Sequence, residues 1–254
     1  MKENRCLNCN TTLEGKYCSS CGQKADTHRL DWHYLWHDLP HSILHLDKGI
    51  FFTIKELSIR PASTIREFLN GKRVNHFRPL MYLLITGTIA GLIYSNVGVD
   101  SAFARDEATQ ALLQQYQKYQ GKFFNAINLA LLPLQALISW IFIRKFLNYI
   151  EIFTVLCFTL GHLNWLSLIS LITTTVGGAK LQLFGSLLSA AISFGYSAVV
   201  FSQLVNFKSS WKNVLYPMIA WVLNYLVISI IVVLAILIYL AYKEGGAIDI
   251  NYGI

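Results

Sequence analysis

Charged side chains are scarce in this sequence. Asp, Glu, Lys and Arg make up only 14% of its 254 residues, against about 25% in an average soluble domain. Hydrophobic residues account for 54%, and apolar runs of about 20 residues, the length that crosses a hydrocarbon core, recur along the chain. This composition excludes an ordinary soluble domain and predicts an all-α polytopic membrane protein.

Two further features are missing. The first residues, MKENRC, are polar and lack the apolar core of a cleavable signal peptide, so we expect the first membrane helix to direct insertion. No Ser–His–Asp order, glycine-rich phosphate loop or pair of carboxylates stands out. The sequence therefore favours a protein that is not an enzyme, with an enzyme as the weaker alternative.

Five apolar runs are long enough to span a membrane at a rise of about 1.5 Å per residue. We expect them to form a five-helix transmembrane domain over residues 79–242, followed by a short external tail over 243–254. A cysteine-rich segment (1–27) and amphipathic pre-membrane helices (28–78) should precede this domain. The predicted spans are 79–97, 124–146, 152–176, 183–205 and 214–241.

The loops around these spans differ in charge. Lys and Arg gather before the first span, between the second and third, and between the fourth and fifth, whereas the loops at 100–122 and 173–182 are mixed or nearly neutral. Cytoplasmic loops are enriched in Lys and Arg, so we expect a cytoplasmic N-terminus and an external C-terminus. The net charge of +7 then reflects topology and contact with anionic membrane lipids rather than nucleic acid.

Four cysteines lie close together in the stretch CLNCNTTLEGKYCSSCG. Cys6-x2-Cys9 and Cys18-x2-Cys21 are two CxxC knuckles whose thiolates can converge on one tetrahedral Zn²⁺. Disulfides are one alternative, which a reducing cytoplasm disfavours, and an iron–sulfur centre is another. Because four sulfurs fill the coordination shell of zinc, we expect a structural zinc ribbon that is used for docking.

The knuckles need tight turns, which we expect Asn8, Gly15 and Gly22 to supply. The segment is too short to hold a hydrophobic core, so its folding should depend on the metal. The fifth cysteine, Cys157, lies in the third predicted span and is expected to be a packing residue.

The stretch DWHYLWHDLPHSILHLD, at residues 31–47, places apolar residues at helical spacing. Trp32 and Trp36 favour the headgroup region, so we expect interfacial helices divided at Pro40. The histidines recur every fourth residue and could form a second metal site or sense pH. The polar side of an interfacial helix is the simpler interpretation. These histidines are His33, His37, His41 and His45.

A second amphipathic segment, RPASTIREFLNGKR, follows. Pro61 suits the first turn of a helix, and Gly71 can end it. Thr64 and Glu67 have the spacing of a capping box. We expect this segment to lie at the membrane interface, where it can meet lipid or a partner. Its basic residues near the membrane boundary are Lys72, Arg73 and Arg78.

Over roughly residues 6–85 the chain resembles a family of uncharacterised bacterial membrane proteins. Its members pair an N-terminal zinc ribbon with an arginine-proline and glycine-lysine-arginine signature before the first span. The resemblance implies the bacterial inner membrane and brings no established activity. Yip-type membrane proteins are similar in topology only. The positions that match the signature are Arg60, Pro61, Ile65, Glu67, Gly71, Lys72, Arg73 and Pro79.

Three polar residues, Gln135, His162 and Asn224, lie inside predicted spans, each about ten residues or about 15 Å from the cytoplasmic boundary. Because polar groups are costly in a membrane, we expect them to form a layer near the midplane of the bundle. The layer could join helices as packing contacts, or it could line a small cavity for a lipid headgroup, a solute or a proton.

The sequence supports three functions, in decreasing order. The first is an integral membrane adaptor whose zinc ribbon and interfacial helices dock another protein. The second is a lipid-handling or small-solute transport protein that uses the polar layer. The third is a membrane-tethered nucleic-acid binder, which the few aromatic and basic residues of the ribbon disfavour. Small residues at every fourth position of the fourth span also permit a homo-oligomer.

Overall fold

The computed structural model of the protein describes residues 5–32, 49–96, 107–176, 179–205 and 210–245. Apart from two isolated bridges among the cysteines, the regular structure of these residues is helical. The helices are α1 (Gly49–Ile59), α2 (Pro61–Leu69), α3 (Pro79–Asn96), α4 (Glu107–Ile143), α5 (Tyr149–Val176), α6 (Ala179–Leu204) and α7 (Ser210–Gly245).

Five helices of the described chain are long and apolar enough to cross a membrane, which confirms the predicted fold class. Helix α4 begins well before its predicted span, because residues 107–120 are rich in Gln and also contain Ala and Leu, which favour a helix. It therefore includes most of the stretch 100–122 that connects the first two predicted spans. The spans are Pro79–Asn96, Gly121–Ile143, Tyr149–Leu168, Phe184–Leu204 and Trp211–Val232.

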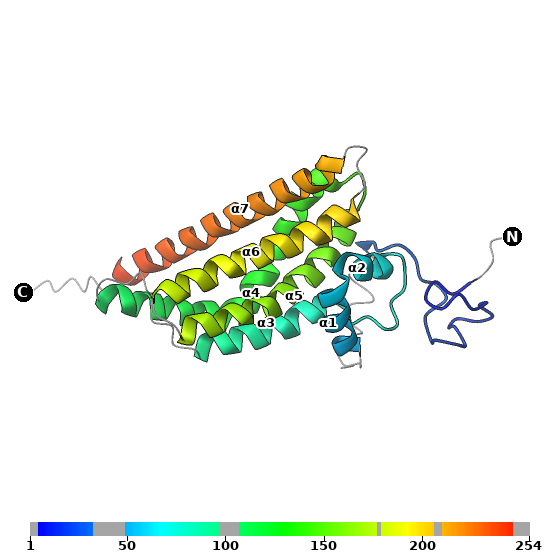
Figure 1. Ribbon diagram of the computed structural model, residues 1–254, viewed down its shortest axis with the longest axis horizontal. Helices are drawn as coiled ribbons and strands as arrows, with labels where there is room; N and C mark the ends of the chain where they lie inside the picture. The colour runs from blue at the N-terminus through cyan, green and yellow to red at the C-terminus, as the bar shows by residue number, and fades with distance from the viewer. Residues whose placement is uncertain (1–4, 33–48, 97–106, 177–178, 206–209, 246–254) are drawn as a thin grey trace, which may run out of the picture.

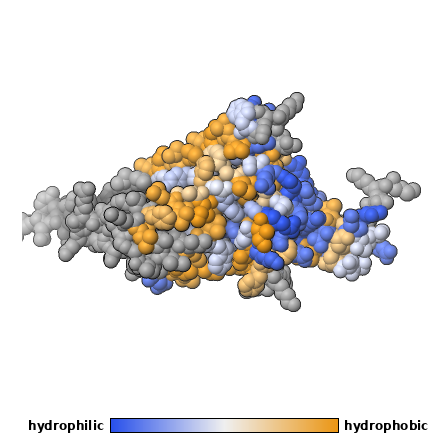
Figure 2. Space-filling view, in the orientation of Figure 1, coloured by the Kyte–Doolittle hydropathy of each residue, from blue (hydrophilic) through white to orange (hydrophobic). Residues whose placement is uncertain are grey.

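Helix α5 lies at the centre of the bundle. It packs against α3, α4 and α6 and also contacts α1 and α2, and Figure 1 shows the two short helices together at one end of the long ones. Of the most apolar stretch of each span, 67% is buried in α5 but only 22% in α6 and α7. Figure 2 shows hydrophobic residues over the long helices and hydrophilic residues at the α2 end. This distribution is that of a multi-pass membrane protein.

Helices α1 and α2, with the loop 70–78, form a unit that we call the cap. Pro61 stands in the first turn of α2 as predicted, but the Thr64 hydroxyl donates to the Arg60 carbonyl at 2.8 Å rather than capping the helix. The predicted capping box of α2 is therefore wrong. The carboxylate of Glu67 instead accepts a hydrogen bond from the Arg60 guanidinium at 3.0 Å.

Helix α2 ends in a left-handed turn. The Gly71 N–H donates to the Phe68 carbonyl at 3.1 Å, and the Lys72 N–H donates to the Glu67 carbonyl at 2.9 Å, which is the bond pattern of a Schellman motif. Gly71 has a φ of +98°, a conformation that glycine adopts without a steric penalty. The glycine of the signature therefore ends α2, as the sequence predicts.

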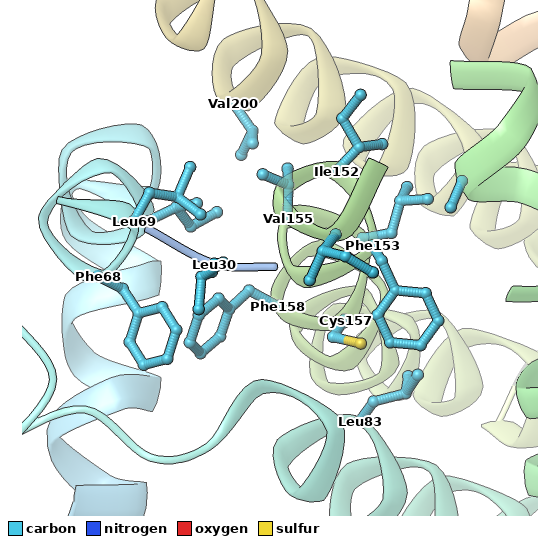
Figure 3. Close-up of a cluster of buried hydrophobic side chains, with 14 of the residues drawn as sticks. Leu30, Phe68, Leu69, Leu83, Ile152, Phe153, Val155, Cys157, Phe158 and Val200 are labelled. Atoms are coloured by element: carbon cyan, nitrogen blue, oxygen red, sulfur yellow. The ribbon is translucent and has the colours of Figure 1, made fainter. Parts of the chain in front are cut away.

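A shared hydrophobic core joins the cap to the bundle. Phe68 of α2 meets Phe158 of α5 edge-on, with ring centroids 5.2 Å apart. Leu30, from the segment that precedes the cap, is fully buried in the same cluster (Figure 3). Burial of such side chains stabilises a fold by about 2–5 kcal/mol each when judged by truncation to alanine. The cap and residue 30 are thus integral to the membrane domain.

Candidate metal centre and its contacts with the membrane domain

The sulfurs of Cys6, Cys9, Cys18 and Cys21 converge within 4.8 Å of one another. The sulfurs of Cys6 and Cys21 are 3.5 Å apart, and those of Cys9 and Cys18 are 3.4 Å apart. Zinc binds four thiolates tetrahedrally at about 2.3 Å, which places neighbouring sulfurs about 3.8 Å from each other. The four sulfurs therefore fit one tetrahedral metal ion. Iron is held by the same ligands, so the geometry identifies a metal-binding cluster rather than a particular metal.

Both knuckles close by the same turn. The Asn10 N–H donates to the Cys6 carbonyl and the Gly22 N–H to the Cys18 carbonyl, each at 2.9 Å. The φ angles of Asn10 and Gly22 are +65° and +75°, in the left-handed region that Asn and Gly visit most readily. Gly22 has its predicted role, whereas the first knuckle turns at Asn10 rather than Asn8.

The cysteines differ in environment. Cys9 is exposed, and its hydrogen bond with the Thr11 hydroxyl, at 3.3 Å, lowers its pKa to about 6. Desolvation raises the pKa of Cys21 to about 11. A bound divalent cation favours the thiolate form of every ligand. Cys157 is buried in the hydrophobic core of α5, apart from this cluster.

The cysteine segment (residues 5–25) rests on the turn that ends α2. A β-carbon at Gly71 would lie 2.6 Å from Leu7 Cδ1, so the first knuckle approaches the backbone at 71 as closely as glycine permits. The Arg73 N–H donates to Gln23 Oε1 at 3.1 Å, and the Arg73 guanidinium donates to the His28 carbonyl at 2.8 Å. Two signature residues, Gly71 and Arg73, therefore hold the cysteine segment against the cap.

Residues 29 and 30 are fastened to the start of α5. Asn148 and Glu151 form a capping box there: the Glu151 N–H donates to Asn148 Oδ1, and the Asn148 N–H donates to the Glu151 carboxylate, each at 2.8 Å. The Arg29 guanidinium donates two bonds, of 2.5 and 2.7 Å, to this carboxylate, which raises the pKa of Arg29. The Asn148 amide donates to the Leu30 carbonyl at 2.9 Å. We call these four residues the linker clamp.

The predicted interfacial helix is described only at its start. Trp32 is half exposed and stacks on Tyr149 of α5, with ring centroids 5.4 Å apart. Trp36 and the four periodic histidines, His33, His37, His41 and His45, lie outside the described residues.

The remaining signature residues have mostly internal roles. Arg60 bonds both Glu56 of α1 and Glu67 of α2, so it fixes the angle between the two cap helices. Arg78 is half-buried at the start of α3. Lys72 is exposed, and it is therefore the signature residue best placed for contact with lipid or a partner.

His162 belongs to a cluster near the cap. Its Nδ1 lies 3.0 Å from the Tyr82 hydroxyl and its Nε2 lies 3.3 Å from the Ser58 hydroxyl, while its ring stacks on Tyr196 at 5.1 Å. Tyr82 belongs to the first turn of α3. His162 is therefore near the capped end of the bundle, because α5 begins well beyond the start of α3 at that end. Counting from the start of α5 placed it too deep.

The other two members of the predicted layer lie on α4 and α7. The Asn224 amide of α7 donates to the Ser139 hydroxyl of α4 at 2.9 Å, and Gln135 is buried in α4. No hydrogen bond described for this structure joins Gln135, His162 and Asn224 to one another. The hydrogen bonds of His162 lead to α1 and α3, whereas that of Asn224 leads to α4.

A polar contact that sequence reasoning missed lies between α3, α4 and α5. The Asn125 amide donates to the Thr88 hydroxyl at 2.6 Å, and the Asn164 amide donates to the Thr86 hydroxyl at 3.3 Å. These asparagines flank Gly87, where a β-carbon would lie 2.0 Å from Asn125 Oδ1. No periodicity in the sequence indicates these two asparagines. By contrast, the capping box at the start of α5 could have been predicted from the spacing of Asn148 and Glu151.

A cavity of about 480 Å³ lies between the cysteine segment, the cap and the adjoining ends of α5 and α6. Its apolar lining comes from Leu69, Phe146, Leu147 and Leu204, and its charged lining from Arg29, Arg66 and Glu151. The cavity is therefore bounded both by the cysteine segment and by the membrane domain.

Residues 47–91 match a protein family described as a protein of unknown function (DUF3667). The matched stretch includes α1, α2, the loop 70–78 and the first part of α3. It therefore contains the arginine-proline and glycine-lysine-arginine signature, while the cysteine segment and the later spans lie outside it. No curated protein and no solved structure matches the chain.

Proposed function

We propose that this protein is a bacterial inner-membrane adaptor whose zinc-organised cysteine segment and cap form a docking platform on the cytoplasmic face. The observation that carries the proposal is the attachment of the knuckles to the cap through Leu7, Gly71, Gln23 and Arg73. Because of these contacts the cysteine segment is part of a fixed surface rather than a freely tethered module.

Charge and chemistry support this placement. The loops at the capped end are enriched in Lys and Arg, which favours the cytoplasm for that end. A reducing cytoplasm keeps thiolates available for a metal, and a shell of four sulfurs suits a structural zinc ion. The metal would then set the position of the knuckles, and the knuckles would present the docking surface.

The outer face of the cysteine segment offers a suitable contact residue. Tyr17 is 65% exposed, and its backbone bridges to Lys24 while the ring faces solvent. Aromatic side chains of this kind are enriched among the residues that dominate binding energy at protein interfaces. A partner that covers Tyr17 would recognise the folded knuckle and so require the metal.

Site-specific photo-cross-linking in native membranes tests the proposal. A benzophenone amino acid at Tyr17 should yield one discrete cross-linked partner, and the Cys6→Ser/Cys18→Ser variant should lose it. The control carries the probe at Leu92, which is 60% exposed on α3. The same products at both positions, or a Tyr17 product that survives loss of the metal ligands, would contradict the adaptor function.

A further inference from the structure

The cavity between the cysteine segment and the bundle lies where the membrane spans end. Leu204 is the last residue of the α6 span, and Glu151 belongs to the first turn of α5. Phe146 and Leu147 lie in the connection between the α4 and α5 spans. Residues at the ends of spans sit at the depth of lipid headgroups. The cavity therefore lies at the capped ends of the α5 and α6 spans, on the side of the bundle that borders one headgroup layer.

The charged lining of the cavity is positive. The lining contains two positive guanidinium groups, those of Arg29 and Arg66, and one negative carboxylate, that of Glu151. Its net charge is therefore +1. Arg29 uses two donors on Glu151, and Arg66 uses one on the Gln203 carbonyl at the end of α6. A guanidinium has five N–H donors, so both arginines keep donors for a further oxygen ligand. A monoanion with several acceptor oxygens complements this lining.

The apolar part of the lining indicates that the bound anion also has an apolar part. Leu69, Phe146, Leu147 and Leu204 line the same cavity, so its occupant has an apolar part beside its charge. Arginine pairs with phosphate through short, charge-assisted bonds. A volume of about 480 Å³ is that of a small-molecule site. A phosphodiester with its glycerol and the first acyl carbons has this combination of size, charge and polarity.

We propose that this cavity is a binding site for the headgroup of an anionic phospholipid. Arg66 binds the phosphodiester, Arg29 is held beside it by Glu151, and the leucines and Phe146 contact the glycerol and the upper acyl chain. The cysteine segment closes the cytoplasmic side of the site. The site is independent of the adaptor function, because it would hold lipid whether or not a protein docks on the knuckles.

Lipid binding by the full-length, metal-loaded protein tests this site. Native mass spectrometry from detergent, with phosphatidylglycerol and phosphatidylcholine as the probes, should show at least about tenfold tighter binding of phosphatidylglycerol. Arg66→Gln should remove about tenfold of that affinity, since a charge-assisted hydrogen bond contributes roughly that factor. Lys55→Gln removes an equal charge from an exposed position of α1 outside the cavity lining and should change the affinity less than twofold.

A second variant keeps the test decisive if Arg66→Gln perturbs the cap. Asn70→Trp places a bulky ring at an exposed position of the cavity lining and should weaken phosphatidylglycerol binding while the metal content stays at that of the unmodified chain. Equal losses for Arg66→Gln and Lys55→Gln would show diffuse surface attraction and overturn the site. Displacement of the lipid by excess inorganic phosphate or by a polyglutamate peptide at equal charge would also overturn it.

Discussion

The backbone of Gly71 faces the side chain of Leu7 so closely that a β-carbon at position 71 would lie 2.6 Å from Leu7 Cδ1. The two residues are 64 positions apart, one in the first cysteine knuckle and the other in the turn that ends α2. Their contact places the candidate metal centre on the cap. The glycine of the signature therefore serves both the turn and the docking of the knuckle.

Substitution of this glycine should loosen the cysteine segment. Gly71→Ala introduces a clash with Leu7 and a left-handed alanine, which together should lower the free energy of unfolding by about 1–3 kcal/mol. Thermal unfolding in detergent and protease cleavage near residue 28 measure the effect. Gly15→Ala is the matched control, because nothing lies within 4 Å of its added β-carbon. Equal effects of the two substitutions would contradict the contact.

The linker clamp predicts an energetic coupling between Arg29 and Glu151. A double-mutant cycle with Arg29→Met and Glu151→Gln should give a coupling of about 1 kcal/mol, a small value because the Arg29 side chain is 64% exposed to solvent. Glu151→Gln alone should cost more than Arg29→Met, since it also weakens the helix cap with Asn148. Chemical unfolding in mixed micelles gives the free energy of unfolding of the unmodified protein, the two single variants and the double variant. If the stability losses of the two single variants simply add in the double variant, the Arg29–Glu151 ion pair contributes nothing to stability.

The four converging cysteines predict one metal ion for each chain. Replacing any one of Cys6, Cys9, Cys18 or Cys21 by serine should reduce bound metal at least about tenfold, because each supplies a quarter of the ligand shell. Elemental analysis of the purified protein measures the metal and also identifies it. Cys157→Ser should keep the full metal content. If this substitution also removed the metal, the assignment of the four N-terminal cysteines as the ligands would be wrong.

His76 predicts a dependence of cap stability on pH. Its ring lies edge-on to Phe52 and Phe68, and neither ring nitrogen makes a hydrogen bond within the described structure. Desolvation lowers the pKa of His76 below 6.5, although the negative charges of Glu67 and Glu56 partly oppose it. The unfolded chain therefore takes up the proton first as pH falls. Stability should be full above about pH 6.5 and decrease below it.

The substitution His76→Phe should remove most of this dependence. Phenylalanine keeps the edge-on ring contacts and cannot be protonated, so the unfolding temperature should vary less between pH 5 and pH 7, a range set by the ordinary pKa of about 6.5. Thermal unfolding of both chains across that range makes the comparison. An unchanged slope in the variant would assign the pH dependence to other groups.

Close packing at the centre of the bundle predicts a difference between two glycines. A β-carbon at Gly161 of α5 would lie 2.7 Å from the Tyr82 ring and 3.2 Å from the backbone of Leu83. Gly161→Ala should therefore cost about 1–3 kcal/mol through overpacking. Gly195→Ala in α6 meets nothing within 4 Å and should be neutral. Detergent stability of the two variants, compared side by side, tests the central position of α5.

The spans could be predicted from the sequence because apolar length alone decides whether a helix can cross a membrane. The cysteine cluster could be predicted because its ligands lie within 16 residues, from Cys6 to Cys21, and spacing constrains them strongly. The turn at Gly71 was readable for the same local reason. These features depend on short stretches of chain.

The contacts that assemble the site could not be predicted, because they join distant segments. Arg29 and Glu151 are separated by 122 positions, and Leu7 carries no sign that it meets a glycine turn. The depth of His162 was misjudged because α5 extends past the start of α3, which hydropathy does not reveal. Local rules also failed at the start of α2. Thr64 and Glu67 have capping-box spacing, but the helix begins at Pro61, so Thr64 lies inside it and its hydroxyl donates to the Arg60 carbonyl.

We expect metal binding to hold the knuckles on the cap, and amide hydrogen exchange at Arg73 measures whether it does. The Arg73 N–H is bonded to the side chain of Gln23 in the cysteine segment, so its protection reports the docked state. Removal of the metal with a chelator should expose the amide at residue 73 and leave the α2 amide of Thr64, which bonds Arg60, protected. Unchanged protection of Arg73 after the metal has left would show that the knuckles stay on the cap without it.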